Sequence, residues 1–528
     1  MNKSLSNSNQ SNILADLKSG FLIFLIALPL CLGISIASGF PAIGGIITAA
    51  VGGCIVSFLG SSRLTIKGPA AGLIVIVVGA VMELGGSDLS IGYHRALAVG
   101  VVAALLQMLL SFFRVANLGI SISRSVVHGM LSAIGVIIIA KQVHVMLGVK
   151  PEAKTIFDLI FAIPNSLIHA NPIISAIGVG SFLILIFWPK IKSKITKILP
   201  AQIIILLIVI PLSYFLNLGS DSNYEFMSNT YSLGSKYLVQ LPKSIFASLA
   251  FPDFSVILSG TSIKYIIMFA LVGMIESTLT VVAIDSIDPK KRNSNLNRDL
   301  FALSCGNLIS SLLGGLPMIS EIVRSKANVD AGATSSKSNF FHGVFLLLFV
   351  VFLPKLLDLI PLAALAAMLV YVGTRLASIS EVIHTKQIGT DQLILFSTTL
   401  LVTLGTDLLI GVGVGLALKI ILHLARGVTI KSLFAGRIEQ SQNGNKMNFK
   451  MYDAAAFPNL FRLRKLILAM PEQIREVTID LSDAKLIDHT FLTGIKNVTN
   501  EKQDVEFKFI GLEKFKSISD HPESTRWL

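Results

Sequence analysis

The chain has 528 residues, of which 53% are hydrophobic and 14% are charged. No soluble domain of this size needs so large an apolar fraction to fill its core, so the composition predicts a polytopic membrane protein. The net charge of +13 comes from 44 Lys and Arg against 31 Asp and Glu, and it indicates nucleic-acid binding only if the basic residues share one surface.

The N-terminal stretch is polar. Met1 to Lys18 carries Asn, Ser and Gln instead of a basic region followed by a short apolar core, so we expect no cleaved signal peptide. Residues 1–12 are predicted to form a disordered cytoplasmic N-terminus. The three cysteines, Cys31, Cys54 and Cys305, are scattered over apolar segments, which favours packing over a disulfide framework or a metal cluster.

Fourteen apolar segments follow in two series of seven. Most approach the roughly 20 residues that a spanning helix requires. The third and tenth are short, open on Gly or Pro and occupy equivalent places in the two halves, and an odd number of spans per half inverts one half relative to the other. We therefore predict an α-helical polytopic membrane protein built as a 7+7 inverted repeat. The first series lies near residues 20–38, 42–60, 69–84, 94–113, 125–147, 173–189 and 199–217, and the second near 262–284, 299–314, 317–330, 338–354, 360–374, 391–405 and 407–425.

The basic residues of the loops indicate the orientation. Short cytoplasmic loops carry an excess of Lys and Arg, whereas the turns at Gly39 to Pro41 and Gly314 to Leu316 carry none. The positive charge is therefore mostly an orientation signal, which predicts both termini in the cytoplasm and argues against nucleic acid as a partner. The turns assigned to the cytoplasm carry Arg63 and Lys67, Arg114 and Arg124, the run "KIKSKITK" at 190–197, Lys290 to Arg292, Arg375 and Lys386, and Arg426.

The third and tenth segments predict an anion site. They open with "KGPAAGL", Lys67 to Leu73, and with "GGLPMISEIVRSK", Gly314 to Lys326. A helix that begins in mid-membrane has unpaired N–H groups and about half a positive charge at its first turn, and two such starts face one another in an inverted repeat. Arg324, about six residues or roughly 9 Å along its helix, adds a full positive charge. The predicted anion-binding residues are Gly68, Pro69, Ala70, Ala71, Gly72, Pro317, Met318, Ile319, Ser320 and Arg324.

Two plainer interpretations of these segments stay open. Gly-Pro pairs are also ordinary kinks of membrane helices. Arg324 is alternatively a cytoplasmic orientation charge like Lys326, since a half-helix soon reaches the surface. Glu321, one turn into the tenth helix, would repel an anion unless an i, i+3 pair with Arg324 offsets both charges.

Four stretches resemble the SulP family of inorganic anion transporters. They are "LVGMIESTLTVVAIDSI" at 271–287, the run from "NSNLNRDL" to "DAGATS" at 293–335, "IPLAALAAMLVYVGTRL" at 360–376, and "KGPAAGL". The resemblance covers about residues 13–428, which we take as the transport domain. It implies a fourteen-segment inverted repeat like that of the uracil transporters, divided into core and gate domains. It also implies substrate binding between the third and tenth segments and a cytoplasmic C-terminal STAS domain.

Glu276, in "MIESTLT", is the expected coupling residue. An ionisable side chain inside the membrane is costly and usually serves an ion pathway, and a structural salt bridge is the alternative. SulP relatives carry Asp or Glu at the matching place, and a Thr four residues later, here Thr280, helps to hold sodium in bicarbonate carriers. The i, i+4 spacing puts both residues on one helix face. The sequence permits Na+ held by Glu276 and Thr280, or H+ on the carboxyl group.

Two departures from the wider family bear on the substrate. The first segment has "ALPLCLG", Ala27 to Gly33, where many relatives carry Gln after Leu-Pro, and Glu321 is unusual. Such variants resemble a branch that moves bicarbonate, so we expect secondary active transport of bicarbonate in preference to sulfate, coupled to Na+ or H+. An anion channel or exchanger stays open as an alternative. So does a nucleobase or dicarboxylate carrier, because Glu276 and Glu321 could reach a ring edge.

After Arg426 the composition becomes that of a soluble domain. "REVTIDLSDAKLIDHTFLTGIKNV" at 475–498 predicts a strand, a turn and a helix, and "VEFKFIGL" at 505–512 predicts another strand. Residues 429–528 resemble a small α/β STAS domain, which we expect to act on homodimer assembly or regulation. Related modules are phosphorylated on the Ser of Asp-Ser-Ser, but here Asp488 is followed by His489 and Thr490, so phosphorylation is not expected.

Motifs of enzymes are absent from the sequence. None of the nine histidines pairs with another at metal-ligand spacing, and there is no Gly-x-Ser-x-Gly, Walker loop or Cys-x-x-Cys. We therefore expect no enzyme activity, no ATP-driven pumping, and no cofactor apart from a coupling Na+. The expected partners are the anion, the coupling cation, membrane lipid and a second copy of the chain, in a bacterial cytoplasmic membrane.

Overall fold

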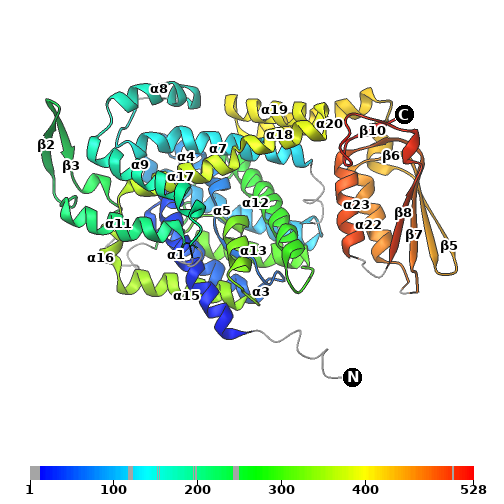
Figure 1. Cartoon of the computed structure of the whole chain (residues 1–528), viewed down its shortest axis with the longest axis horizontal. Coiled ribbons are helices and arrows are strands. Elements are labelled where there is room, and N and C mark those ends of the chain that lie inside the picture. The colour runs from blue at the N-terminus through cyan, green and yellow to red at the C-terminus, as the bar shows by residue number, and fades with distance from the viewer. Residues whose placement is uncertain are drawn as a thin grey trace. The chain divides into compact units, whose positions relative to one another are not determined.

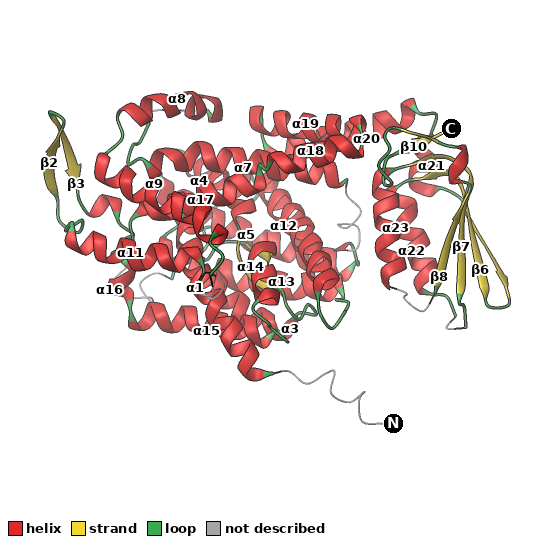
Figure 2. Ribbon diagram, in the orientation of Figure 1, coloured by secondary structure: helices red, strands yellow, loops and turns green. Residues whose placement is uncertain are grey.

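The chain forms two compact units, one mainly helical with two short strand pairs and the other with helices and a six-stranded sheet (Figure 2). The computed structural model describes residues 12–116, 123–151, 153, 155–193, 196, 199–241, 249–471, 473–501 and 505–528. One unit comprises Met1–Ala116 and Ile134–Leu376, and the other comprises Asn117–Ala133 and Ala377–Leu528. The stretch predicted to be disordered, residues 1–12, lies outside the described residues apart from Asn12. The Asn12 side chain accepts a hydrogen bond from the Ala15 backbone and so caps the first helix.

The first half of the chain contains a helix for each of the first seven predicted segments (Figure 1). Several of these helices begin with a side-chain N-cap. Asp88, for example, accepts hydrogen bonds from the backbone N–H groups of Ser90 and Ile91 at the start of the helix Leu89–Phe112. The elements are α1 (Ile13–Ala37), α2 (Ala42–Val51), the π-helical η1 (Gly52–Val56), α3 (Ser57–Leu59), β1 (Ile66–Pro69), η2 (Ala71–Leu73), α4 (Ile74–Gly85), α5 (Leu89–Phe112), α7 (Arg124–Met146), α8 (Ile156–Ile168), α9 (Pro172–Phe187), η3 (Trp188–Lys190) and α11 (Ala201–Phe215).

The second half repeats this order after a short hairpin and the 3-10 turn η4 (Ser235–Tyr237). Ser259 caps the long helix that carries Glu276, and Asn295 caps the next one. The elements are β2 (Ser222–Phe226), β3 (Asn229–Leu233), α12 (Gly260–Ile287), α13 (Leu296–Leu312), β4 (Met318–Glu321), α14 (Ile322–Asp330), α15 (Lys337–Phe352), α16 (Pro354–Leu357), α17 (Leu362–Leu376), α18 (Ile379–Ile388), α19 (Thr390–Gly405) and α20 (Leu408–Ala425).

Membrane-spanning character follows from length and apolar composition. Eight of the described helices are long and apolar enough to cross a membrane, and five shorter helices of 10–17 residues are also apolar. Every predicted apolar segment corresponds to one of the helices above, so the predicted α-helical polytopic fold is confirmed.

The elements that were not predicted include the helices α8 and α18 and the β2–β3 hairpin. In the hairpin, the Tyr224 and Tyr231 rings stack with centroids 5.6 Å apart. The turn residues, Met227 and Ser228, adopt positive φ angles of 47° and 66°. Hairpin turns of this kind usually carry Asn or Gly, so the sequence contains no signal for this one.

The C-terminal region is a mixed sheet with two long helices. The strand order is β5-β6-β7-β10-β9, with β8 also on β7, and β6, β7 and β8 run parallel. Phe449, Ile479 and Phe491 are fully buried in its core. The strand, helix and strand predicted within residues 475–512 are confirmed. The elements are α21 (Ile430–Ala435), β5 (Ile438–Asn443), β6 (Lys446–Ala455), α22 (Phe457–Leu468), β7 (Glu476–Ile487), α23 (His489–Glu501), β8 (Glu506–Ile510), η6 (Leu512–Lys514), β9 (Lys516–Ser517) and β10 (Arg526–Trp527).

A buried ion pair ties α20 to the start of α23. Lys419 Nζ lies 2.9 Å from Asp488 Oδ2 and donates to Thr490 Oγ1 at 2.8 Å. Asp488 Oδ1 accepts a hydrogen bond from the Phe491 backbone, so this carboxylate also caps α23. Burial alone would raise the pKa of Asp488, but Lys419 and His423 outweigh it and hold the pKa below its ordinary value.

We expect Asp488→Asn to destabilise the C-terminal domain by about 1–3 kcal/mol at pH 7, because it removes the charge that Lys419 faces. Because the pKa of Asp488 is lower in the folded state, its ionised side chain stabilises the fold fully above the unfolded Asp pKa of about 4. This stabilisation is lost as the pH falls through the folded-state pKa. Proteolysis rates of this domain in the full chain, measured from pH 7 downward, should therefore rise in the wild type and change less in the variant. Asp483→Asn, which removes an exposed partner of Lys450, is the control. Equal pH dependence in wild type and Asp488→Asn would contradict the prediction.

Candidate functional site

The third and tenth segments meet as an antiparallel pair of short strands. In the pair of β1 and β4, Lys67 lies opposite Ser320 and Gly68 lies opposite Ile319. Backbone polar groups inside a membrane need partners within the protein, and each strand supplies them to the other. The helical parts, α4 and α14, follow the two strands.

This pairing corrects the prediction that the half-helices begin at the Gly-Pro sequences. Pro317 precedes β4, and α14 begins at Ile322. Pro69 ends β1, and the helical turn begins at Ala71. Arg324 is thus the third residue of α14, and the predicted 9 Å offset is wrong, because two residues rise about 3 Å. A strand pair satisfies donors and acceptors of both segments, whereas two facing helix starts would leave up to four N–H groups unpaired on each.

All ten predicted anion-binding residues lie at this junction and are buried. Gly68 and Pro69 belong to β1, and Met318, Ile319 and Ser320 belong to β4. The structure thus brings the two motifs together. The other predicted residues flank the strands: Pro317 precedes β4, Ala70, Ala71 and Gly72 follow β1, and Arg324 lies in the first turn of α14.

Arg324 crosses from the tenth segment to the third. Its side chain is 1% exposed, and Nη2 donates to the Pro69 carbonyl oxygen. A Cβ atom on Gly68 would lie 3.0 Å from Nη1, so the absence of a side chain there lets the guanidinium approach. Glu321 Oε2 lies 3.8 Å from Nε, which has no hydrogen-bond partner. Arg324 is therefore a buried cation with only partial compensation, which does not fit a surface orientation charge.

Glu276 lies against the start of the third segment's helical turn. A Cβ atom on Gly72 would lie 2.5 Å from both carboxylate oxygens of Glu276, so only glycine fits there. The side chain is buried, and Oε1 has no hydrogen-bond partner. Thr280, one turn later on α12, is also buried. The pair expected to couple transport to a cation thus adjoins the predicted anion site.

Lys67 was assigned to a cytoplasmic turn, and the structure corrects this. Lys67 is 2% exposed within β1, where Nζ pairs with Asp299 and donates to Ser320 Oγ at 2.7 Å. Asp299 Oδ1 also accepts from the backbone N–H groups of Ser61 at 3.2 Å and Ser62 at 3.0 Å. The charge of Lys67 is thus compensated by a buried carboxylate, unlike that of Arg324.

An amide cluster, which sequence reasoning missed, fixes the strand β4. Asn307 Oδ1 accepts from the Met318 backbone N–H at 2.6 Å, and Asn307 Nδ2 donates to Gln107 Oε1 at 3.0 Å. Ser277 Oγ accepts from the Ser320 backbone N–H at 3.2 Å. Two amide side chains inside apolar segments were the available signal, because such groups are costly in lipid unless they are paired within the protein.

The junction offers one buried donor and one buried acceptor that lack partners, Arg324 Nε and Glu276 Oε1. Buried polar groups are normally paired, and these two atoms are among the exceptions in the described part of the chain. In the described part of the chain, no group of three or more His, Cys, Asp and Glu residues could hold a metal ion. The chemistry available is the binding of a small anion by Arg324 beside an acid that can take a cation or a proton.

Comparison with known proteins places most of the chain in one family model. Residues 13–399 match the model described as the sulfate permease family. The putative sulfate transporter YvdB of Bacillus subtilis is 24% identical over 413 residues, which cover 78% of this chain and 73% of that protein. The bicarbonate transporter BicA of Picosynechococcus sp. is 24% identical over 423 residues, which cover 80% and 72%.

Solved structures share the fold. The transmembrane domain of a cyanobacterium bicarbonate transporter BicA matches with a TM-score of 0.64 at 22% identity, over 75% of this chain and 97% of that one. The murine Solute Carrier 26 family member A9 anion transporter matches with a TM-score of 0.68 at 16% identity, over 94% and 84%. The second match extends into the C-terminal region, which fits a STAS domain. These relatives are transporters and not enzymes, as the sequence predicted.

The Lys67–Asp299 pair yields a stability prediction. Asp299→Asn removes one partner of a buried ion pair and should lower the unfolding free energy by about 3–5 kcal/mol, measured by SDS denaturation in mixed micelles. A double replacement, Lys67→Met with Asp299→Leu, should recover much of this loss because neither charge is left buried alone.

Lys264→Gln is the matched control, since Lys264 is half-exposed and pairs with the exposed Glu83. Its effect should stay within about 1 kcal/mol. If Asp299→Asn is no more destabilising than this control, the buried pair does not hold the strands.

Proposed function

Because the chain belongs to the sulfate permease family and is thus an integral membrane anion transporter, we propose that it carries bicarbonate in preference to sulfate by secondary active transport. The observation that carries the proposal is Arg324, a buried guanidinium whose Nε has no hydrogen-bond partner. A buried cation with an open donor is costly unless an anion is held beside it.

The proposed substrate site is the junction of β1 and β4. The first turns that follow these strands, at Ala71 and Ile322, add partial positive charge from N–H groups without intrahelical partners. Arg324 would supply the full charge, and Gly68 leaves room for its approach to the third segment. Small buried residues such as Ala70 leave backbone within reach of a compact anion.

The charges around the junction favour a monoanion. Arg324 carries one positive charge, and Glu321 and Glu276 carry one negative charge each when ionised. A divalent sulfate would meet more repulsion from these acids than a bicarbonate ion does. The Picosynechococcus relative, named a bicarbonate transporter, supports this choice, whereas the Bacillus relative, named a putative sulfate transporter, supports sulfate as the alternative.

The same charge balance supports coupling to Na+ or H+. Anion binding next to an ionised Glu276 adds negative charge to a buried region, and a bound cation or proton on the carboxylate offsets it. Glu276 Oε1, buried without a partner, fits a proton or one ligand position of Na+, and the Thr280 hydroxyl lies one turn away. An exchanger or channel on the same fold is the second candidate, and it would not require Glu276 to load a cation.

The wider assignment rests on composition and charge. We propose a bacterial cytoplasmic membrane with both termini inside, because the basic turns favour that side, and a reporter fused after Leu528 that appears outside would contradict it. The C-terminal domain, residues 429–528 in the predicted division, is proposed to act on homodimer assembly or regulation. The transport domain would then be residues 13–428.

The test of the function is uptake into proteoliposomes. The purified full chain should take up labelled bicarbonate more readily than sulfate, and only when an ion gradient is present. Uptake is measured with and without Na+ in matched pH gradients. Uptake that needs Na+ identifies symport with Na+, and uptake that follows the pH gradient alone identifies H+. Currents far above carrier turnover would favour the channel instead.

Arg324→Ala should weaken bicarbonate affinity by about 1–3 kcal/mol, which is roughly tenfold to a hundredfold, because it removes a charge-assisted contact. Arg324→Lys should recover part of the loss, since it restores a point charge without the planar fork. Apparent affinity measured by concentration-dependent uptake in purified, reconstituted variants is the readout.

Lys326→Ala is the matched control for Arg324→Ala, since Lys326 is exposed on the same helix. Glu321→Gln should raise anion affinity, because it frees Arg324 from its 3.8 Å partner. Unchanged affinity in Arg324→Ala would refute the assignment of this residue.

Glu276→Gln should leave the protein folded and remove the cation dependence of uptake. The amide keeps the volume but cannot offer the negative charge that a coupling cation neutralises. Uptake in Na+ and pH gradients is compared with that of Glu225→Gln, an exposed acid on the β2–β3 hairpin. Retained cation dependence in Glu276→Gln would make this residue structural.

A further inference from the structure

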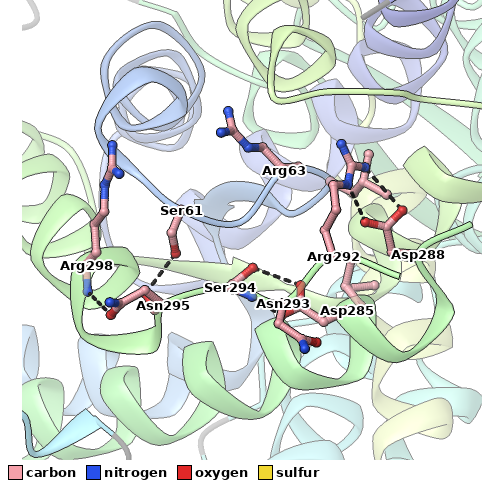
Figure 3. Close-up of a pocket in the computed structure, with 11 residues that line it drawn as sticks. Ser61, Arg63, Asp285, Asp288, Arg292, Asn293, Ser294, Asn295 and Arg298 are labelled. Carbon is pink, nitrogen blue, oxygen red and sulfur yellow. Dashed lines mark hydrogen bonds and ion pairs between the residues drawn. The ribbon is translucent and has the colours of Figure 1, made fainter. Parts of the chain in front are cut away.

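A polar pocket lies between the turn before β1 and the loop that joins α12 to α13. Its volume is about 360 Å³, within the range of small-molecule sites. Three arginines line it, Arg63 from the turn and Arg292 and Arg298 from the loop and the start of α13. In the view of Figure 3, Arg298 lies at the left, Arg63 near the middle and Arg292 to the right. The transport junction lies elsewhere, since none of the predicted anion-binding residues lines this pocket.

One of these arginines is already used by the fold. Arg292 Nε and Nη2 donate to the two oxygens of Asp288, at 2.6 and 3.1 Å, and Nη1 donates to the Thr334 carbonyl oxygen at 2.9 Å. Arg292 therefore neutralises Asp288 and fixes the loop. These donors leave little capacity for a ligand.

The other two arginines have free donors. Arg63 is exposed and has no hydrogen bond or ion pair within the described part of the chain, and no interaction is drawn from it in Figure 3. Arg298 donates through Nε to the Leu59 carbonyl oxygen at 3.2 Å, which orients the side chain and leaves its two terminal nitrogen atoms available. Arg63 and Arg298 thus bring two planar guanidinium groups from separate elements to one pocket, and such groups bind phosphate oxygens through paired N–H donors.

The rest of the pocket indicates what the anionic group is attached to. Asp285 accepts from the Ser294 backbone N–H at 2.7 Å and from Ser294 Oγ at 2.8 Å, which leaves lone pairs for further donors. Asn293 is exposed beside it. A bare oxyanion such as sulfate has no donor for a carboxylate, and it would fill only part of the cavity. A body that carries hydroxyl groups would satisfy Asp285 while its phosphate binds the arginines.

We infer that this pocket binds a phosphomonoester attached to a hydroxylated body, through Arg63 and Arg298, as a site separate from the transport junction. The phosphate is borne either by a soluble molecule such as a nucleoside monophosphate or by a lipid headgroup. The site goes beyond the proposed transport function and does not depend on which anion is carried.

The experiment uses the full chain in phosphatidylcholine nanodiscs. AMP, adenosine and inorganic phosphate are titrated by calorimetry for the soluble source, and nanodiscs that contain phosphatidylinositol 4-phosphate test the lipid source by competition with AMP. Saturable binding of AMP, weaker binding of phosphate and none of adenosine are expected. Displacement of AMP by the phosphoinositide would identify the lipid as an occupant, and retained AMP binding would identify the soluble source.

Arg63→Gln and Arg298→Gln should each weaken AMP binding at least tenfold. Arg63→Lys keeps the positive charge but lacks the planar guanidinium group, so it should weaken AMP binding less than Arg63→Gln does. Such partial binding would show that the loss in Arg63→Gln is not caused by misfolding. Asp285→Asn should reduce the preference for AMP over inorganic phosphate. Lys355→Gln, an exposed basic residue on α16 outside the pocket, and Arg324→Ala, in the transport junction, should leave AMP binding unchanged.

Three results would overturn the inference. The first is that neither AMP nor the phosphoinositide binds saturably. The second is that AMP binding survives in the Arg63→Gln and Arg298→Gln double variant. The third is that AMP binding is lost in Arg324→Ala and that bicarbonate competes with AMP. The last result would assign the phosphate to the transport junction and leave the pocket without a ligand.

Discussion

The need to pair every backbone polar group inside a membrane governs the centre of this protein. The two segments meet in a four-residue strand pair, β1 with β4, before their helical parts begin. Strand geometry then sorts the side chains, since opposite residues share a face and successive residues alternate. The side chains of Lys67 and Ser320 lie on one face of the pair, and that of Ile319, opposite Gly68, lies on the other. The strand pair thus fixes the place of Lys67 and Ser320, which hydrogen-bond to one another.

The two buried cations of the junction, Lys67 and Arg324, are paired to different degrees. Asp299 pairs directly with Lys67 and is itself held by two backbone N–H groups, so this pair is a structural tie. Glu321 lies 3.8 Å from Arg324 Nε and leaves that donor without a hydrogen bond. A membrane protein can tolerate such incomplete pairing where function needs it, because other parts of the fold keep the segment in place. Here the amide cluster around Asn307 holds β4.

The sequence was sufficient for the elements whose signal is local. Long apolar runs predicted the fourteen segments, and the alternation in residues 475–512 predicted the C-terminal strand, helix and strand. The breaks at Gly-Pro located the junction, but its strand pair could not be predicted, because a four-residue strand depends on a partner far along the chain. Lys67 was misplaced in a turn for the same reason, since its partner Asp299 is 232 residues away. The lack of a hydrogen-bond partner at Arg324 Nε and at Glu276 Oε1 is likewise a property of the assembled fold.

The distance along the chain between the two strands has a consequence for biogenesis. Pro69 and Arg324, which touch across the junction, are 255 residues apart. At a synthesis rate of 5–20 residues per second, the second strand leaves the ribosome roughly 10–50 s after the first. During this interval β1 has an open edge and Lys67 has no counter-ion, so the insertion machinery or water has to shield them. A ribosome that stalls before Met318 therefore leaves an inserted first half whose central strand cannot close.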